Sequence, residues 1–290
     1  MRIIGLVANK DKKAAFELIP QIINSLEAKQ ARLMLESETA VLAGRPDLAA
    51  SWADISQNCQ GIIVLGGDGT VLNTARTIIQ VPLLGVNLGR VGFLSEVDIP
   101  ELESSLQKLI NDEYILEERM MLFSQVIRQG QVLDNSIALN DAVITKGAFS
   151  RMIRLKAEVD KETIAVYPVD GLIVSSPTGS TAYSLSSGGP VVVPNMDLMI
   201  LTPICPHTLW ARPMVMPASR QLKITVLSDN AEIMLTMDGQ YAYRLEPGDE
   251  VLITKASCSA KFIKLSDRSF YSVLHSKLSE GDLKIDETSS

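Results

Sequence analysis

The sequence predicts an α/β N-terminal domain with a Rossmann-like parallel sheet, followed by an all-β, sandwich-like C-terminal domain. The length of 290 residues is about twice that of a typical domain. Over roughly the first 115 residues, short apolar runs alternate with segments of helical period, which is typical of parallel strands joined by crossover helices. From about residue 121, strand-like runs follow one another at short intervals, as in antiparallel sheets.

The first domain is expected to contain four buried strands and the helices that connect them. The strands are the apolar runs 3–8, 31–35, 62–65 and 83–86. The helix after the first strand contains Pro20, which predicts either a kink or a later start, because an interior proline costs about 3 kcal/mol. A further helix is expected after Asp98, which would cap it, with Pro100 just inside its first turn.

The second domain is expected to be built from strands with one short helical interruption. The predicted strands are 123–127, 137–145, 153–159, 172–175, 222–227, 233–237 and 251–254, and the helical segment is 180–187. Asp238 and Gly239 predict a hairpin turn. The predicted domains are residues 1–118 and 119–266, and the apolar start of segment 267–290 predicts that this segment packs back on the first domain, with a frayed polar end after residue 278.

Charge and composition restrict the classes of partner. The chain has 27 Lys and Arg against 34 Asp and Glu, a net charge of −7, which argues against nucleic-acid or membrane partners held by a broad basic surface. The three cysteines are far apart and form no disulfide framework. The N-terminal apolar run is too short for a signal peptide, and no run reaches the roughly 18 residues of a membrane span. We therefore expect a cytoplasmic protein that holds any phosphate ligand locally.

A glycine-rich turn follows the apolar run 62–65. It consists of Gly66, Gly67, Asp68, Gly69 and Thr70, and a helix is expected to begin near residue 71. Glycines permit close backbone approach, and amides at a helix start can bind phosphate oxygens. Asp68 could hold Mg²⁺ through water or accept a proton from an attacking hydroxyl, and both roles suit phosphoryl transfer. The alternative is a tight strand-to-helix turn with Thr70 as its N-cap.

A second segment rich in small residues spans 170–190. A strand ends in a proline turn, and Thr178, Ser180 and Thr181 then open a short helix that also carries Tyr183. Hydroxyls and amides at a helix start fit a diphosphate or the edge of a sugar. The alternative is a Ser/Thr-rich surface turn with a capped helix.

These motifs together resemble the NAD kinase family. The matching segments are, in order, 66–70 (GGDGT), 87–94 (NLGRVGFL), 140–141 (ND), 170–190 and 238–240 (DGQ). The GGDGT turn alone is shared with diacylglycerol kinases, sphingosine kinases and 6-phosphofructokinases, whereas the run 178–190 is particular to NAD kinases. The resemblance implies phosphorylation of the adenosine ribose 2′-hydroxyl of NAD by ATP, with a divalent metal, Mg²⁺ by expectation. It also implies an active site between the two domains and a homo-oligomer, either a dimer or a tetramer.

The resemblance also implies roles for individual residues. Asp68 would be the catalytic acid that activates or orients the 2′-hydroxyl, and no metal ligand is assigned. The phosphate-binding residues would be Gly66, Gly67, Thr70 and Arg90. The substrate-binding residues would be Gly69, Phe93, Asn140, Asp141, Asp170, Thr178, Thr181, Ala182, Tyr183 and Gln240.

Two positions depart from the family pattern. Asp141 stands where the family usually has glutamate, so its carboxylate reaches about 1.5 Å less far, roughly one C–C bond. Leu88 stands where a threonine is common.

Two alternative functions remain at this point: a lipid or sugar kinase that shares the GGDGT turn, and a dinucleotide sensor without catalytic activity. The acidic net charge and the absence of a basic amphipathic helix disfavour a lipid substrate.

Overall fold

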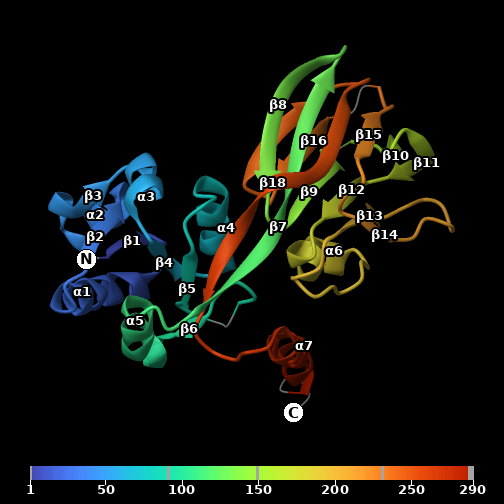
Figure 1. Cartoon of the computed structure of the whole chain (residues 1–290). Coiled ribbons are helices and arrows are strands. Elements are labelled where there is room, and N and C mark those ends of the chain that lie inside the picture. Colours follow the sequence, from blue (N-terminus) through green and yellow to red (C-terminus); the bar gives the residue numbers. More distant parts are fainter. Residues whose placement is uncertain (1, 90–91, 148–149, 230–231, 287–290) are drawn as a thin grey trace. The chain divides into compact units, whose positions relative to one another are not determined.

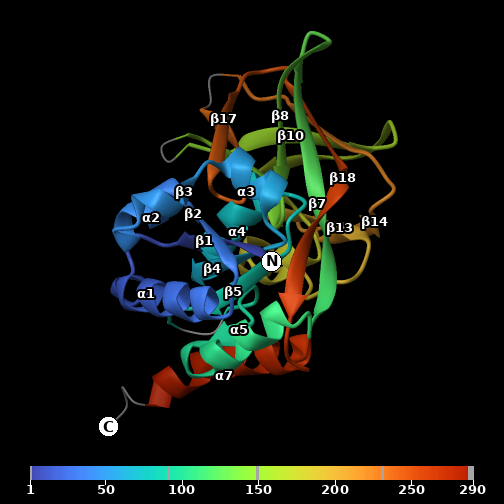
Figure 2. The same cartoon turned by 60° about the vertical axis from the view of Figure 1, so that its left-hand side comes forward.

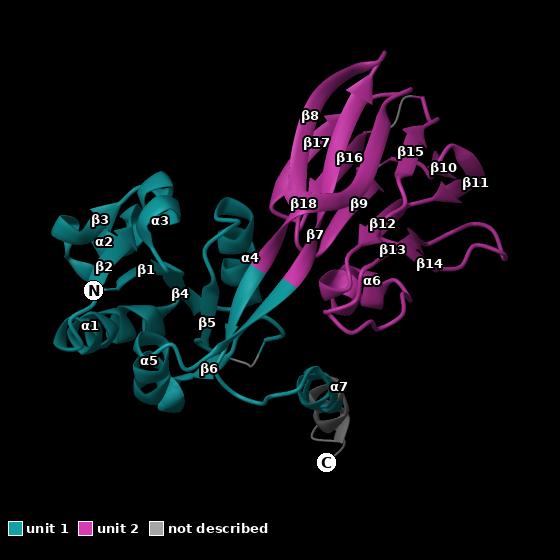
Figure 3. Cartoon of the chain, in the orientation of Figure 1, with its two compact units in different colours: residues 1–118, 261–290 teal, residues 119–260 magenta. Residues whose placement is uncertain are grey.

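The computed structural model describes residues 2–89, 92–147, 150–229 and 232–286 (Figure 1). The chain divides into two compact units, residues 1–118 with 261–290, and residues 119–260 (Figure 3). The chain leaves the first unit in strand β7 (Ile115–Arg128) and returns to it in strand β18 (Glu250–Lys264).

The first unit is a parallel sheet of order β5-β4-β1-β2-β3, with β6 and the end of β18 also paired to β5. Its strands are β1 (Ile3–Ala8), β2 (Arg32–Glu36), β3 (Ala49–Ala50), β4 (Gly61–Gly66), β5 (Leu83–Asn87) and β6 (Val97–Asp98). Its helices are α1 (Lys13–Ala28), α2 (Ser37–Ala43), α3 (Trp52–Asn58), α4 (Asp68–Thr77), α5 (Leu102–Ile110) and α7 (Phe270–Asp286), with 3₁₀ turns η1 (Pro46–Leu48) and η2 (Ile99–Glu101).

Helices cover both faces of this sheet. Helices α1 and α5 lie on one side of the strands, and α3 and α4 lie on the other (Figure 1, Figure 2). The central strands are the most buried: every residue of β4 and β5 is buried, as are four of the six residues of β1. This is expected for parallel strands between two helical layers. The predicted Rossmann-like layer is therefore confirmed.

Two details of the first unit differ from the sequence prediction. Helix α1 begins at Lys13 and continues through Pro20, so the later start is wrong. Its apolar face is buried, and at about 1.5–3 kcal/mol for each large apolar side chain this burial outweighs the proline. Asp98 caps no helix through its side chain; instead it accepts a hydrogen bond from the Asn87 side chain at 3.2 Å and pairs with Arg268 at 3.5 Å.

The second unit contains two antiparallel sheets. One has the order β14-β13-β12-β9-β16-β17, and the other contains β11-β10-β15-β18 with the hairpin β7–β8 on β18. The bounds are β8 (Gln131–Ala138), β9 (Asp141–Lys146), β10 (Ile153–Val159), β11 (Glu162–Val169), β12 (Gly171–Ser175), β13 (Leu198–Ile204), β14 (Met214–Pro217), β15 (Leu222–Val226), β16 (Ile233–Met237) and β17 (Tyr241–Leu245). A 3₁₀ turn η3 (Thr178–Thr181) and the short helix α6 (Tyr183–Ser186) follow β12.

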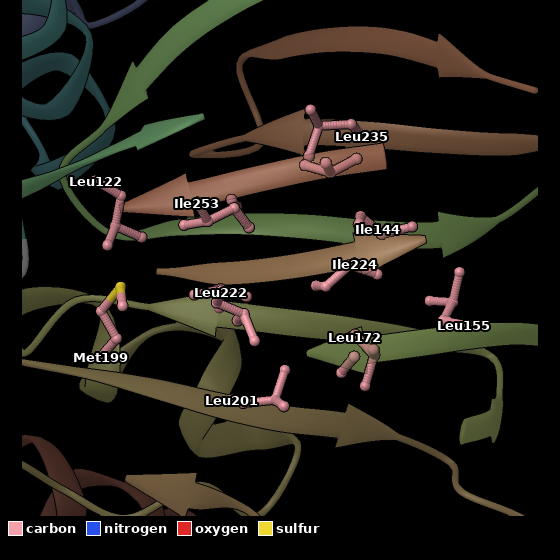
Figure 4. Close-up of a cluster of buried hydrophobic side chains, with 14 of the residues drawn as sticks. Leu122, Ile144, Leu155, Leu172, Met199, Leu201, Leu222, Ile224, Leu235 and Ile253 are labelled. Carbon is pink, nitrogen blue, oxygen red and sulfur yellow. The ribbon is translucent and has the colours of Figure 1, made fainter. Parts of the chain in front are cut away.

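One hydrophobic core joins the two sheets of this unit. Leu155, Ile224 and Ile253 from one sheet and Ile144 and Leu201 from the other belong to a single buried cluster. Figure 4 shows these side chains gathered between the strands. The predicted sandwich-like, all-β character is confirmed, because the inner faces of both sheets contribute to one core.

Two segments of the chain depart from the predicted elements. The apolar run 137–145 is not one strand, since β8 ends at Ala138 and β9 begins at Asp141. Near the C-terminus, helix α7 continues past residue 278 to Asp286. Within the described residues, no helix is long and apolar enough to cross a membrane.

Candidate functional site

The glycine-rich turn lies at the carboxyl end of β4. Gly67 is the N-cap of α4, which begins at Asp68 rather than near residue 71. Thr70 lies inside the helix, so its predicted alternative role as N-cap is wrong; its hydroxyl accepts a hydrogen bond from the Asn9 side chain at 3.2 Å. A Cβ at Gly66 would lie 2.4 Å from that hydroxyl, whereas a Cβ at Gly67 would meet nothing within 4 Å. The turn is thus closely packed at Gly66 and open at Gly67.

The carboxylate of Asp68 is held by the backbone of a neighbouring loop. Its Oδ2 accepts the Phe93 N–H at 2.8 Å and its Oδ1 accepts the Leu94 N–H at 3.1 Å. A Cβ on Gly92 would lie only 1.8 Å from Asp68 Oδ1. Loop 92–94 therefore closes tightly around this carboxylate and fixes its orientation.

The C-terminal segment anchors this loop. Glu96, 5% exposed, accepts the backbone N–H groups of Leu265 and Ser266, each at 2.9 Å, and pairs with Lys264. The ring of Phe93 packs against that of Phe270 with centroids 6.2 Å apart. The residues that surround Asp68 are therefore tied to the part of the chain that returns at the C-terminus.

The second unit contains a pocket of about 410 Å³. It brings together four of the predicted binding residues, Asn140, Asp141, Ala182 and Tyr183. The other lining residues are Val143, Thr145, Thr236, Asp238 and Gly239. Apolar walls with a few convergent polar groups are typical of small-molecule sites.

Asp238 was predicted as part of a hairpin turn and of the matching segment 238–240, but its place in the pocket was not predicted. The turn is confirmed: Asp238 and Gly239 have φ values of 55° and 63°, both in the left-handed region, between β16 and β17. Asn9, which contacts Thr70, was missed as well. Its position directly after β1 could have identified it, because the carboxyl ends of neighbouring parallel strands meet at one edge of a sheet.

The remaining predicted residues occupy other places. The Thr181 hydroxyl donates to the carbonyl of Thr178 at 3.3 Å, and the Thr178 hydroxyl is buried without a hydrogen-bond partner in the described structure. Asp170 lies 3.7 Å from Lys146 Nζ, and the Gln240 N–H donates to the carbonyl of Met237 at 3.0 Å. None of these four predicted residues lines the pocket. Arg90 lies outside the described residues.

The carboxyl group of Asp141, which lines the pocket, has a raised pKa. It is 6% exposed, and burial together with the nearby charge of Asp238 raises its pKa to about 7. Both causes disfavour the charged form. We therefore expect the charge of Asp141 to change near pH 7.

This pKa predicts how the stability of the protein depends on pH. The folded state holds the Asp141 proton up to about pH 7, whereas the unfolded chain releases it near the ordinary pKa of 3.8. Asp141 therefore lowers the free energy of unfolding progressively as the pH rises from the lower to the higher of these pKa values. Asp141→Asn removes the effect. The free energy of unfolding of the variant, minus that of the original protein, should rise by up to about 3 kcal/mol from about pH 5 to about pH 8. Urea unfolding at both pH values measures this difference.

A matched variant controls for the loss of a negative charge. Asp267→Asn makes the same chemical change at an exposed position of the first unit. If both variants change equally between the two pH values, the interpretation of the Asp141 environment is wrong.

Comparison with known proteins extends over both units. A model of the ATP-NAD kinase N-terminal domain matches residues 4–114, and a model of the ATP-NAD kinase C-terminal domain matches residues 139–265. The chain is 46% identical to an NAD kinase of Moorella thermoacetica, over 99% of this chain and 92% of that protein. It is 45% identical to an NAD kinase of Desulforamulus reducens, over 97% and 98% of the two chains.

Solved structures show the same fold. A yeast NADH kinase complexed with NADH has a TM-score of 0.89 at 24% identity, over 96% of this chain and 88% of that chain. An NAD kinase from Archaeoglobus fulgidus in complex with ATP has a TM-score of 0.75 at 25% identity, over 93% and 98% of the two chains.

Proposed function

Since this chain belongs to the NAD kinase family, we propose that it transfers the γ-phosphoryl group of ATP to the 2′-hydroxyl of the adenosine ribose of NAD, giving NADP and ADP. The observation that best supports the proposal is the environment of the Asp68 carboxylate. Two backbone amides orient its carboxylate at an open, glycine-rich helix start, which is an arrangement suited to phosphoryl transfer.

Asp68 acts on the attacking hydroxyl in this proposal. A bond forms between the ribose 2′-oxygen and the γ-phosphorus while the bond from that phosphorus to the bridging oxygen of ADP breaks, and the hydroxyl proton must leave. The Asp68 carboxylate orients the hydroxyl and accepts that proton. Because the transferred group demands little covalent chemistry from the protein, most of the rate enhancement comes from positioning and electrostatics.

We propose that the two units are the two domains of the enzyme and divide the substrates between them. Gly66, Gly67, Thr70 and Arg90 would bind phosphate in the first domain. The pocket of the second domain would bind the dinucleotide through the residues that line it. The predicted contacts of the other substrate residues, Gly69, Phe93, Asp170, Thr178, Thr181 and Gln240, are part of the same proposal.

The turn also fits a divalent metal that arrives with ATP. In the described part of the chain, no group of three or more His, Cys, Asp or Glu side chains is placed to hold a metal. Mg²⁺ is commonly bound by one or two carboxylates together with substrate phosphates. Each Asp68 oxygen accepts one amide hydrogen bond and keeps acceptor capacity, so Asp68 would hold Mg²⁺ through a water molecule and would remain able to accept the hydroxyl proton. When bound, the ion would neutralise charge on the phosphates.

One assay tests the proposed reaction. The purified protein is incubated with ATP, Mg²⁺ and NAD, and NADP is followed with an NADP-specific dehydrogenase; we expect NADP to accumulate. Tight NAD binding without NADP would support a dinucleotide sensor. Neither binding nor NADP would support a lipid or sugar kinase.

The assembly and location of the protein are further parts of the proposal. We expect a homo-oligomer, either a dimer or a tetramer, in the cytoplasm. Size-exclusion chromatography with light scattering gives the oligomeric state, and a monomeric mass at micromolar concentration would contradict the expectation.

The shorter acid at position 141 gives a prediction about substrate binding. Asp141→Glu should leave the KM for NAD and the kcat equal to or better than those of the original enzyme. The pocket of about 410 Å³ has room for one methylene, and the added length restores the reach of the carboxylate. Steady-state kinetics with varied NAD measures both constants. A collapse of NAD affinity would show that the pocket is built around the shorter acid.

A further inference from the structure

We propose that Asp238 is a positioning residue of the pocket in the second unit: its carboxylate fixes the backbone of residues 139–141 so that Asn140 and Asp141 face the ligand. This inference rests on the proposed function, because it concerns the pocket assigned to NAD. It explains why the apolar run 137–145 does not form one continuous strand.

The carboxylate of Asp238 accepts three consecutive backbone N–H groups. Its Oδ2 accepts from Leu139 at 2.9 Å, and its Oδ1 accepts from Asn140 at 2.8 Å and from Asp141 at 3.1 Å. In return, the Asp238 N–H donates to the carbonyl of Asp141 at 2.9 Å. Asp238 is 8% exposed, so these charge-assisted bonds are shielded from water and strong.

The carbonyl groups of Leu139 and Asn140 are hydrogen-bonded as well. The Ser176 N–H donates to the Asn140 carbonyl at 2.8 Å, and the Ser176 hydroxyl donates to the Leu139 carbonyl. A Cβ on Gly179 would lie 2.1 Å from the Asn140 carbonyl oxygen, so the start of η3 packs directly on it. The N–H and C=O groups of Asn140 are therefore both bound, and its backbone cannot rotate without losing these contacts.

Asp238 also has an electrostatic effect on the pocket. The titratable side chains that line the pocket with Asp141 are Asp238, from the β16–β17 turn, and Tyr183, from α6; on the neighbouring strand β12, Asp141 is paired with Ser175. The charge of Asp238 is one of the two causes that raise the pKa of Asp141 to about 7. A positioning role through Asp238 therefore has a pH signature that a purely structural role lacks.

Asp238→Asn tests the inference, since the amide nitrogen that replaces one oxygen cannot accept a hydrogen bond. We expect calorimetry to show that NAD binds about ten-fold more weakly or worse, while the KM for ATP changes less than about two-fold. The pH at which the titration of Asp141 changes NAD affinity, the pH midpoint of NAD binding, should fall.

Asp160→Asn is a matched control in the same unit. Asp160 also has a positive φ, of 49°, in the turn between β10 and β11, and accepts the Gln221 N–H at 3.0 Å, but it does not line the pocket. NAD affinity and pH midpoint equal to the original values in folded Asp238→Asn would overturn the inference.

Two further measurements keep the inference testable if Asp238→Asn does not fold. Asp238→Glu retains both acceptor oxygens, and we expect it to bind NAD more weakly than the original protein but more tightly than the asparagine variant. In the original protein, hydrogen exchange should show protected amides at residues 139–141, and the Asp141 carboxyl carbon should titrate near pH 7 by NMR. Rapid exchange of these amides would contradict the inference.

These readouts separate the inference from the proposed function. A protein that binds NAD without producing NADP contradicts the proposed reaction, yet calorimetry still measures the effect of Asp238. A protein that does not bind NAD contradicts the assignment of the pocket, whereas hydrogen exchange still decides whether Asp238 holds residues 139–141.

Discussion

Asp68→Asn should lower the kcat for NADP formation by about 10²- to 10⁴-fold, the range that general acid–base groups contribute, while the protein remains folded. The asparagine side chain is the same size but cannot accept the proton of the ribose hydroxyl. One of its two terminal atoms becomes a donor that faces the N–H of Phe93 or Leu94, so about 1–3 kcal/mol of stability is lost as well. Single-turnover kinetics with saturating ATP and NAD, together with urea unfolding, measure the two effects.

Asp54→Asn is the matched control for this experiment. Asp54 also lies in the first turn of a helix of the first unit, where its carboxylate accepts the Ser51 N–H at 3.2 Å in a capping box. Its replacement should lower stability without lowering the kcat. Turnover by Asp68→Asn at the original rate would contradict the catalytic role of Asp68.

Gly92→Ala should reduce activity by a similar amount although it removes no proposed catalytic group. The new Cβ would lie 1.8 Å from Asp68 Oδ1 and 2.5 Å from its Cγ, far inside van der Waals contact. Either the Asp68 side chain rotates away, which breaks its bonds to Phe93 and Leu94, or loop 92–94 shifts. Both changes misplace the carboxylate, and the overpacking itself destabilises by about 1–3 kcal/mol. Initial-rate kinetics and thermal unfolding measure these effects.

Gly89→Ala makes the same change three residues earlier, where a Cβ would meet nothing within 4 Å, and should leave the kcat nearly unchanged. A double variant provides a sharper comparison. If Gly92→Ala acts through Asp68, it should lower the kcat little further in an Asp68→Asn background, because effects on one functional unit are not additive. Full additivity would show that loop 92–94 acts independently of Asp68.

Local features of the second unit were predictable, and long-range ones were not. The Asp238–Gly239 turn was predicted because hairpin turns with positive φ values favour this pair of residues. The contact of the Asp238 side chain with residues 139–141 was not, since it joins segments far apart in the chain. The apolar pattern of 137–145 is that of one strand. The hydrogen bonds that residues 139–141 donate to Asp238, together with those that Ser176 donates to the carbonyls of Leu139 and Asn140, interrupt it.

The same distinction applies to the candidate site in the first unit. The turn 66–70 was identified from sequence because glycine and an acid between a buried strand and a helix have a local physical meaning. No local pattern predicted that the amides of Phe93 and Leu94 would donate hydrogen bonds to Asp68. Nor did one predict that Glu96 would connect this loop to residues 264–266.

The sequence by itself determined the class of each half of the chain and the position of the glycine-rich turn, because hydrophobic periodicity and turn chemistry act over a few residues. The family came from the resemblance of five motifs along the chain to those of NAD kinases. The tertiary structure alone decided which backbone amides hold Asp68 and Asp238, where the run 137–145 breaks, and which acid has a perturbed pKa. These properties depend on burial and on partners brought together by packing, and no short window of sequence contains both members of such a pair.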